Sequence, residues 1–194
     1  MKNKPLILAS SSIYRQQLLS RLHLPFTTAN PAIDESPLAS ETPPQTALRL
    51  AEQKARALAA RFPDALIIGS DQVAVLHGQA VGKPGNHANA FQQLSSASGA
   101  TMVFYTALCL LDSGSGVAQL ATASNEVKFR KLTSEQIERY LNAEKPYDCA
   151  GSAKSEGLGI ALIEYIRGDD PNALIGLPLI DLITMLERAG VKVA

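Results

Sequence analysis

An uninterrupted apolar run at residues 65–69 is followed at once by Ser70-Asp71-Gln72. A strand that is apolar on both sides of its pleat must be covered on both faces, as parallel strands are in α/β proteins. Burying an ionised carboxylate there would be costly, so we expect Asp71 at the mouth of the strand, where α/β proteins place their sites. By its position alone, Asp71 fits a functional carboxylate and a turn cap equally well.

Strand and helix patterns alternate along the rest of the chain. Short apolar or alternating runs predict strands at residues 6–9, 26–29, 102–111, 117–129 and 160–166. Capping signals and apolar residues at helical spacing predict helices after Ser12 and near residues 45–61, 88–94, 133–142 and 179–186. A proline-rich loop is expected at 31–44 and a turn at 169–172. This alternation predicts an α/β fold with a mixed sheet, in a single domain over residues 1–194.

The composition favours a small-molecule ligand. The 194 residues include 18 Lys and Arg against 18 Asp and Glu, so the formal net charge is zero and no global field for a nucleic-acid backbone exists. An RNA-binding module would also need exposed aromatic residues on a basic surface, which this chain does not offer plainly. Cys109 and Cys149 form no CxxC pair, so neither a disulfide framework nor a thiolate zinc site is expected.

The first residues give no targeting signal. Met1-Lys2-Asn3-Lys4-Pro5 leads into an apolar run at residues 6–9, which is too short for a signal-peptide core or a membrane span. We therefore expect a cytoplasmic protein with no membrane partner.

Two cationic positions in the first part of the chain suit an anionic ligand. Ser10-Ser11-Ser12 opens a helix and offers hydroxyl and backbone N–H donors, and Arg15 adds a guanidinium fork in the first turn. An ordinary helix cap explains the serines equally simply. In the helix at 45–61, Lys54 falls on the edge of the apolar stripe, from which its ammonium could follow a cleft wall.

Two later segments offer ligand-binding loops. Lys83 follows Gly82 and precedes Pro84, in a turn that permits close approach of a ligand, although most lysines in turns are only solvated. Residues 149–159 combine glycines, serines, a Lys and a Glu, which fits either a flexible loop or a ligand-lining loop.

No histidine or cysteine cluster has metal-ligand spacing, because His23, His77 and His87 are scattered. A bound metal would need oxygen ligands, which suits Mg²⁺ or Mn²⁺ held partly through substrate phosphates.

The order of these motifs resembles the Maf nucleotide pyrophosphatases. Residues 6–15 resemble the opening S-x-S-x-x-R motif of that family, and Asp34-Glu35, Gln53-Lys54-Ala55, Gly69-Ser70-Asp71-Gln72 and Gly82-Lys83-Pro84 follow in register. The resemblance implies that Asp71 accepts a proton from the attacking water and shares a divalent metal ion with Glu35. It further implies that the phosphate-binding positions are Ser10, Arg15, Lys54 and Lys83.

Residues 152–157 resemble the branch of this family that acts on 7-methyl-GTP, and Tyr14, Gln72 and Glu156 match the positions that separate the branches. A methylated guanine carries positive charge, so Tyr14 could stack on it while Glu156 accepts hydrogen bonds from its N–H donors. The alternative within the family is a dTTP and UTP pyrophosphatase.

The resemblance implies hydrolysis of a nucleoside triphosphate to a monophosphate and diphosphate, in a two-lobed fold like that of the ITPases, with an elongated mixed sheet, a central cleft and a homodimer. A phosphatase that releases the terminal phosphate would use similar residues. A nucleotide-binding regulator of septum formation without turnover is the hypothesis from another class, and it would not need a carboxylate beside the metal.

Overall fold

The computed structural model describes residues 4–193, so Met1–Asn3 of the expected N-terminal segment lie outside the described residues. The strands are β1 (Leu6–Ala9), β2 (Phe26–Ala29), β3 (Leu66–Leu76), β4 (Gln79–Val81), β5 (Thr101–Asp112), β6 (Ala118–Phe129) and β7 (Ile163–Arg167). The helices are α1 (Ile13–Ser20), α2 (Pro43–Ala57), α3 (His87–Ala97), α4 (Ser134–Glu144), α5 (Pro171–Ile175) and α6 (Leu179–Arg188), with 3₁₀ turns η1 (Ala150–Ser152) and η2 (Leu158–Leu162).

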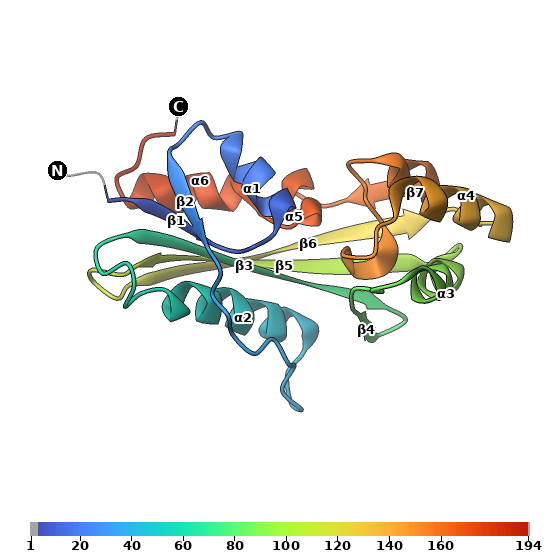
Figure 1. Ribbon diagram of the computed structural model, residues 1–194, viewed down its shortest axis with the longest axis horizontal. Helices are drawn as coiled ribbons and strands as arrows, with labels where there is room; N and C mark the ends of the chain where they lie inside the picture. Colours follow the sequence, from blue (N-terminus) through green and yellow to red (C-terminus); the bar gives the residue numbers. More distant parts are fainter. Residues whose placement is uncertain (1–3, 194) are drawn as a thin grey trace. The chain divides into compact units, whose positions relative to one another are not determined.

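The strands form one seven-stranded sheet in the order β2-β1-β3-β5-β6-β7, with β4 paired to β3 (Figure 1). β1 runs parallel to β2 and β3, whereas the β3–β4 and β6–β7 pairs are antiparallel. The expected α/β class with a mixed sheet is therefore confirmed.

The contacts divide the described chain into two units. Unit 1 comprises residues 4–71, 106–123 and 170–193, and unit 2 comprises residues 72–105 and 124–169.

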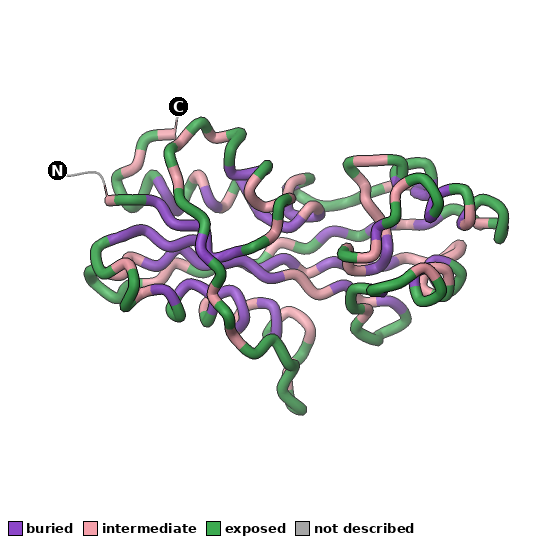
Figure 2. Tube along the Cα trace, in the orientation of Figure 1, coloured by how far each residue is buried: buried purple, intermediate pink, exposed green. Residues whose placement is uncertain are grey.

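Unit 1 has helices on both faces of its strands (Figure 1). On one face, Leu6 and Leu8 of β1 and Leu66 and Ile68 of β3 pack with apolar side chains of α1 and α6. Helix α2 covers the opposite face. The strands at the centre of the unit are buried, whereas the segment before α2 is mostly exposed (Figure 2). Because side chains alternate along a strand, Ile67, Gly69 and Asp71 face α2.

Unit 2 contains the last residues of β3, the first residues of β5 and the last residues of β6. His77 and Gly78, both at positive φ, make the tight turn between β3 and β4, which suits a two-residue hairpin. Helix α3 contacts α4 and η1, and α4 contacts η2. Thr133 and Gln136 close a capping box at the start of α4, which fixes where that helix begins.

Several predicted boundaries differ from the structure for local reasons. Helix α2 begins at Pro43 rather than at residue 45, because proline needs no N–H partner in the first turn of a helix. Strand β7 begins at Ile163, because residues 158–162 form a 3₁₀ helix. The turn expected at 169–172 opens helix α5, with Asp170 as its N-cap and Pro171 in its first turn.

Candidate functional site

The site is founded on the close approach of helix α2 to strand β3. A Cβ atom at Gly69 would overlap the backbone oxygen of Ala51 and would lie 2.9 Å from the backbone nitrogen of Ala55. Any residue larger than glycine would therefore force the helix away from the strand. Lys54 of the helix and Asp71 of the strand can meet because this spacing is so short.

Lys54 joins two carboxylates. Its Nζ atom lies 2.6 Å from Oδ1 of Asp71 and 2.9 Å from Oε1 of Glu35. Lys54 and Asp71 are 4% and 7% exposed, whereas the Glu35 side chain is 57% exposed, so the group runs from the interior to the surface. A buried charged hydrogen bond of this kind is strong, and removing one partner leaves the other charge uncompensated.

The position expected for Asp71 was wrong. Strand β3 continues without a break from Leu66 to Leu76, so Asp71 lies in its interior and is buried. The expectation that a carboxylate must leave the strand neglected the lysine supplied by α2. Lys54 itself is buried rather than lying along a cleft wall, because the small Ala51 and Ala55 beside it bring the helix backbone close to the sheet.

Burial raises the pKa of the Asp71 carboxyl above its ordinary value. The positive charges of Lys54 and Arg15 oppose this increase, whereas the negative charge of Glu35 adds to it. A carboxylate with a raised pKa is a better proton acceptor than an exposed aspartate, and such perturbed groups are typical of functional sites.

Arg15 is held on the other side of the strand by the carbonyl of Gly176. Its Nε atom donates to that oxygen at 2.8 Å. The hydroxyl of the fully buried Ser70 lies 2.8 Å from the Ala107 carbonyl oxygen and 3.0 Å from the Gly176 carbonyl oxygen, between which it shares its proton. Burial lowers the pKa of the Arg15 guanidinium, while the charges of Asp71 and Glu35 raise it. Gly176 has φ +126°, a conformation that favours glycine.

The serine turn before α1 has a mixed role. Ser12 caps the helix, since its hydroxyl accepts from the backbone N–H of Arg15 at 3.4 Å. The Ser10 hydroxyl accepts from the Ser12 N–H at 3.1 Å, and Ser10 is almost fully buried. Tyr14, in the first turn of α1, is half-buried. Unit 1 thus contains all the predicted site residues from Ser10 to Asp71.

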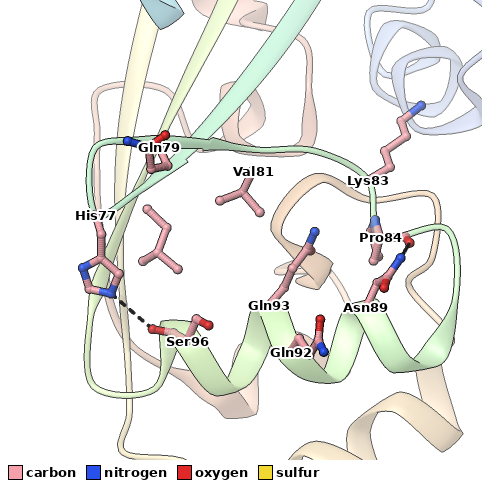
Figure 3. Close-up of a pocket in the computed structure, with 10 residues that line it drawn as sticks. His77, Gln79, Val81, Lys83, Pro84, Asn89, Gln92, Gln93 and Ser96 are labelled. Atoms are coloured by element: carbon pink, nitrogen blue, oxygen red, sulfur yellow. Dashed lines mark hydrogen bonds between the residues drawn. The ribbon is translucent and has the colours of Figure 1, made fainter.

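The remaining predicted positions, Gln72, Lys83 and Glu156, belong to unit 2. Gln72 follows Asp71 in β3 and is half-buried, whereas Lys83 and Glu156 are exposed. Lys83 lies at one end of a hollow of about 460 Å³ between β4 and α3, and its ammonium points away from the side chains that line it (Figure 3).

The segment that carries Glu156 is fixed to α4. Glu144 accepts the Leu158 N–H at 2.6 Å through Oε1 and pairs with the Lys154 ammonium at 3.1 Å through Oε2. These bonds lower the pKa of Glu144, with the Leu158 N–H contributing most. The Lys154 N–H also donates to the hydroxyl of the buried Tyr140. Residues 154–158 are therefore held on both sides of Glu156.

The described residues offer few protein ligands for a divalent cation. Among the residues that the structure describes, no group of three or more His, Cys, Asp or Glu side chains gathers as metal ligands. Glu35 and Asp71, however, converge on one point, the Lys54 ammonium. Two carboxylates with phosphate and water oxygens are a typical Mg²⁺ ligand set.

Sequence patterns alone missed two supports of this site. The Gly176 carbonyl orients Arg15. The signal for the helix before Gly176 was an Asp-Pro pair, which marks an N-cap and a first helical turn. Arg49 was also missed. It binds Glu41 through two nitrogens, at 2.5 and 2.8 Å, and donates to the carbonyl of Ser36 at 3.1 Å, which ties down the segment that carries Glu35.

A family model described as Maf-like protein matches residues 5–189. The chain belongs to the Maf family. Among its Maf relatives, a protein of Methylobacillus flagellatus is 58% identical over 189 residues, which cover 97% of this chain and 98% of the relative. A protein of Nitrosococcus oceani is 57% identical over 188 residues, covering 97% and 94%. Both relatives are named 7-methyl-GTP pyrophosphatase.

The Maf chain also resembles a HAM1 protein from Coxiella burnetii in fold, with a TM-score of 0.53 and 12% sequence identity over 95% of this chain and 99% of that one. At this identity the likeness concerns the fold alone. Among residues 4–193, none of the helices combines the length and the apolar character needed to cross a membrane.

Proposed function

We propose that this Maf protein hydrolyses 7-methyl-GTP to 7-methyl-GMP and diphosphate. The reaction is supported by one observation above all, the buried Asp71 carboxylate with a raised pKa, held by Lys54. The substrate is supported by relatives of 55–58% identity over almost the whole chain that are named 7-methyl-GTP pyrophosphatase.

In this proposal Asp71 accepts the proton of the attacking water. Its partner Lys54 favours the ionised form of the carboxylate, because the positive charge of the ammonium opposes the effect of desolvation on the pKa. The 2.6 Å contact also fixes which way the carboxylate points, since only Oδ1 is occupied by Lys54 in this pair. General base catalysis by a carboxylate of this kind contributes about 10²- to 10⁴-fold.

Three cations would bind the triphosphate and stabilise the charge that develops on the leaving diphosphate. Arg15 presents a guanidinium whose orientation is set by its bond to Gly176. Lys54 lies beside the proton acceptor, and Lys83 extends from the loop before α3 as an exposed ammonium. Ser10 would contribute a hydroxyl to the same phosphates.

Glu35 and Asp71 would hold a divalent cation, Mg²⁺ or Mn²⁺, together with substrate phosphates. When bound, the ion would lower the pKa of water and neutralise phosphate charge. Glu35 suits this role because it is anchored through Lys54 at one oxygen while its side chain stays open to solvent.

Recognition of the base would use Tyr14, Gln72 and Glu156. The positive charge of a 7-methylated guanine favours stacking on Tyr14, and its N1–H and N2–H groups require an acceptor, which the Glu156 carboxylate supplies. A Glu156→Gln variant that keeps the full preference for 7-methyl-GTP over GTP would eliminate this contact from the model.

The test is product analysis with purified protein, Mg²⁺ or Mn²⁺ and a panel of 7-methyl-GTP, GTP, CTP, UTP and dTTP. We expect 7-methyl-GMP and diphosphate from the methylated substrate at the highest rate, and no turnover after chelation until metal is restored. Preference for dTTP and UTP would overturn the substrate assignment but keep the reaction. Release of inorganic phosphate would overturn the bond assignment, and absence of hydrolysis would favour a non-catalytic nucleotide-binding regulator.

We further propose that residues 1–194 form one Maf-like domain that acts as a homodimer in the cytoplasm. Light scattering of the purified protein and fractionation of cells would test the last two points.

A further inference from the structure

The loop that carries Lys83 is held by hydrogen bonds on both sides of this residue. The carbonyl of Gly82 accepts from Nε2 of Gln93 at 3.1 Å, and the carbonyl of Pro84 accepts from Nδ2 of Asn89 at 2.9 Å. The next N–H, that of Gly85, donates to the Tyr147 carbonyl at 2.9 Å. The backbone on each side of Lys83 is therefore fixed, although its own side chain is exposed.

Gln93 has a second partner, in the segment that carries Glu156. The Ser152 hydroxyl donates to Oε1 of Gln93 at 2.5 Å. Ser152 is fully buried and has φ +57°, so a backbone conformation that is unusual for serine is kept where its hydroxyl meets Gln93. Since Oε1 accepts and Nε2 donates, the orientation of the carboxamide is defined at both ends.

One side chain thus connects two segments that are far apart in the sequence. Ser152, Gln93 and Gly82 form a continuous chain of hydrogen bonds from residues 149–159 to the loop of Lys83. Figure 3 shows Gln93 rising from α3 toward this loop, with Asn89 bound to Pro84 beside it. All of these residues belong to unit 2.

We propose that Gln93 is a positioning residue that couples the segment carrying Glu156 to the placement of Lys83. It does not touch the substrate. By donating to the Gly82 carbonyl, Gln93 sets the direction in which the Lys83 ammonium leaves the loop. By accepting from Ser152, Gln93 makes this direction depend on the position of the segment that carries Glu156. The inference rests on the proposed role of Lys83 as a phosphate-binding residue.

Gln93→Ala is compared with Gln92→Ala, which removes an exposed carboxamide from the preceding position of the same helix. A misplaced binding group typically reduces turnover by about 10- to 100-fold, so we expect this loss in kcat/KM for 7-methyl-GTP with Gln93→Ala and less than about 2-fold with Gln92→Ala. Gln93→Glu keeps the length and the acceptor but cannot donate to Gly82, and is expected to lose as much as Gln93→Ala. Ser152→Ala should lower kcat/KM in the same direction.

A double-mutant cycle separates positioning from general loss of structure. In the Lys83→Ala background, Gln93→Ala should reduce kcat/KM by less than about 2-fold, because the group that it positions is already gone. Inhibition by added diphosphate should weaken equally in Gln93→Ala and Lys83→Ala, and not in Gln92→Ala. Full additivity of the two substitutions would overturn the role of Gln93, whereas an unaffected Lys83→Ala enzyme would overturn the proposed role of Lys83 instead.

Discussion

The Nζ atom of Lys54 lies 2.6 Å from Oδ1 of Asp71, and both residues are almost completely withdrawn from solvent. An isolated carboxylate in the middle of a covered strand would be strongly destabilising. Helix α2 approaches β3 closely enough to supply the compensating charge because Gly69 has no side chain to keep the Ala51 backbone away. Burial raises the pKa of Asp71, and Lys54, which makes this burial tolerable, opposes the increase.

Lys54→Met should move the acid limb of the pH profile of kcat/KM to higher pH. Burial raises the pKa of Asp71 and the Lys54 charge lowers it. Loss of the Lys54 charge should therefore raise the pKa of Asp71 further, because only Arg15 then opposes the effect of burial. Residual activity is measured across the pH range for the parent, Lys54→Met and Lys54→Arg, of which the last keeps the charge. A limb that stays in place or moves to lower pH in Lys54→Met would contradict the assignment.

Gly69→Ala should destabilise the fold and reduce activity together. The new methyl group would overlap the Ala51 carbonyl oxygen, and overpacking of this kind costs about 1–3 kcal/mol or more in the free energy of unfolding. Urea denaturation measures the loss.

Gly82→Ala is the matched control, because a Cβ atom at Gly82 would have no heavy atom within 4 Å. Its unfolding midpoint should stay close to that of the parent. If Gly69→Ala is as stable as Gly82→Ala, the close approach of α2 to β3 does not limit this position.

Glu41→Gln should lower stability at neutral pH and have a smaller effect in acid. The pair with Arg49 lowers the pKa of Glu41 from 4.5 to about 2. A carboxyl with a lowered folded-state pKa stabilises the fold at pH above the unfolded value, and this contribution disappears as the pH falls toward the folded value. The difference in urea midpoint between parent and variant should therefore shrink between about pH 6 and about pH 3.

Arg49→Gln removes the same pair from its other side and should follow the same pH trend. A difference from the parent that is constant over this pH range, in both variants, would show that the pair does not contribute through the charge of Glu41.

Glu144→Leu should reduce the preference for 7-methyl-GTP over GTP. It removes the acceptor of the Leu158 N–H and the partner of the Lys154 ammonium, which hold the segment carrying Glu156. A hydrogen bond to a charged group contributes about 1.5–3 kcal/mol, so a loss of selectivity on the order of tenfold is expected. The ratio of kcat/KM values for the two substrates is the measurement, with Glu164→Gln on the exposed side of β7 as control. An unchanged ratio in Glu144→Leu would contradict the role.

Local patterns were sufficient to predict most elements of this fold. The apolar run before Ser70 and the capping signal near residue 133 each reflect interactions between neighbours in the sequence, and the strand and helix that they predict are present. Helix α5 was missed because its five residues are too short for a periodic pattern. The continuation of β3 through Asp71 was missed because it depends on Lys54, a residue of another element.

Which residues make up the candidate site could be predicted only from the order of the motifs in the sequence. Glu35, Lys54 and Asp71 meet through ion pairs that no local spacing encodes, because they come from a loop, a helix and a strand. The hydrogen bond from Arg15 to Gly176 connects residues that are far apart in the sequence, so the local sequence around neither residue could predict it. Tertiary contacts, rather than propensities, determine these relationships.

The most direct test of the account is the turnover of 7-methyl-GTP by Asp71→Asn, a substitution that keeps the shape of the side chain but removes its basic oxygen. Steady-state kcat is measured at saturating metal, with circular dichroism as a check that the variant is folded. We predict a loss of about 10²- to 10⁴-fold relative to the parent. A folded Asp71→Asn protein whose kcat stays within about threefold of the parent would contradict the assignment of Asp71 as the proton acceptor.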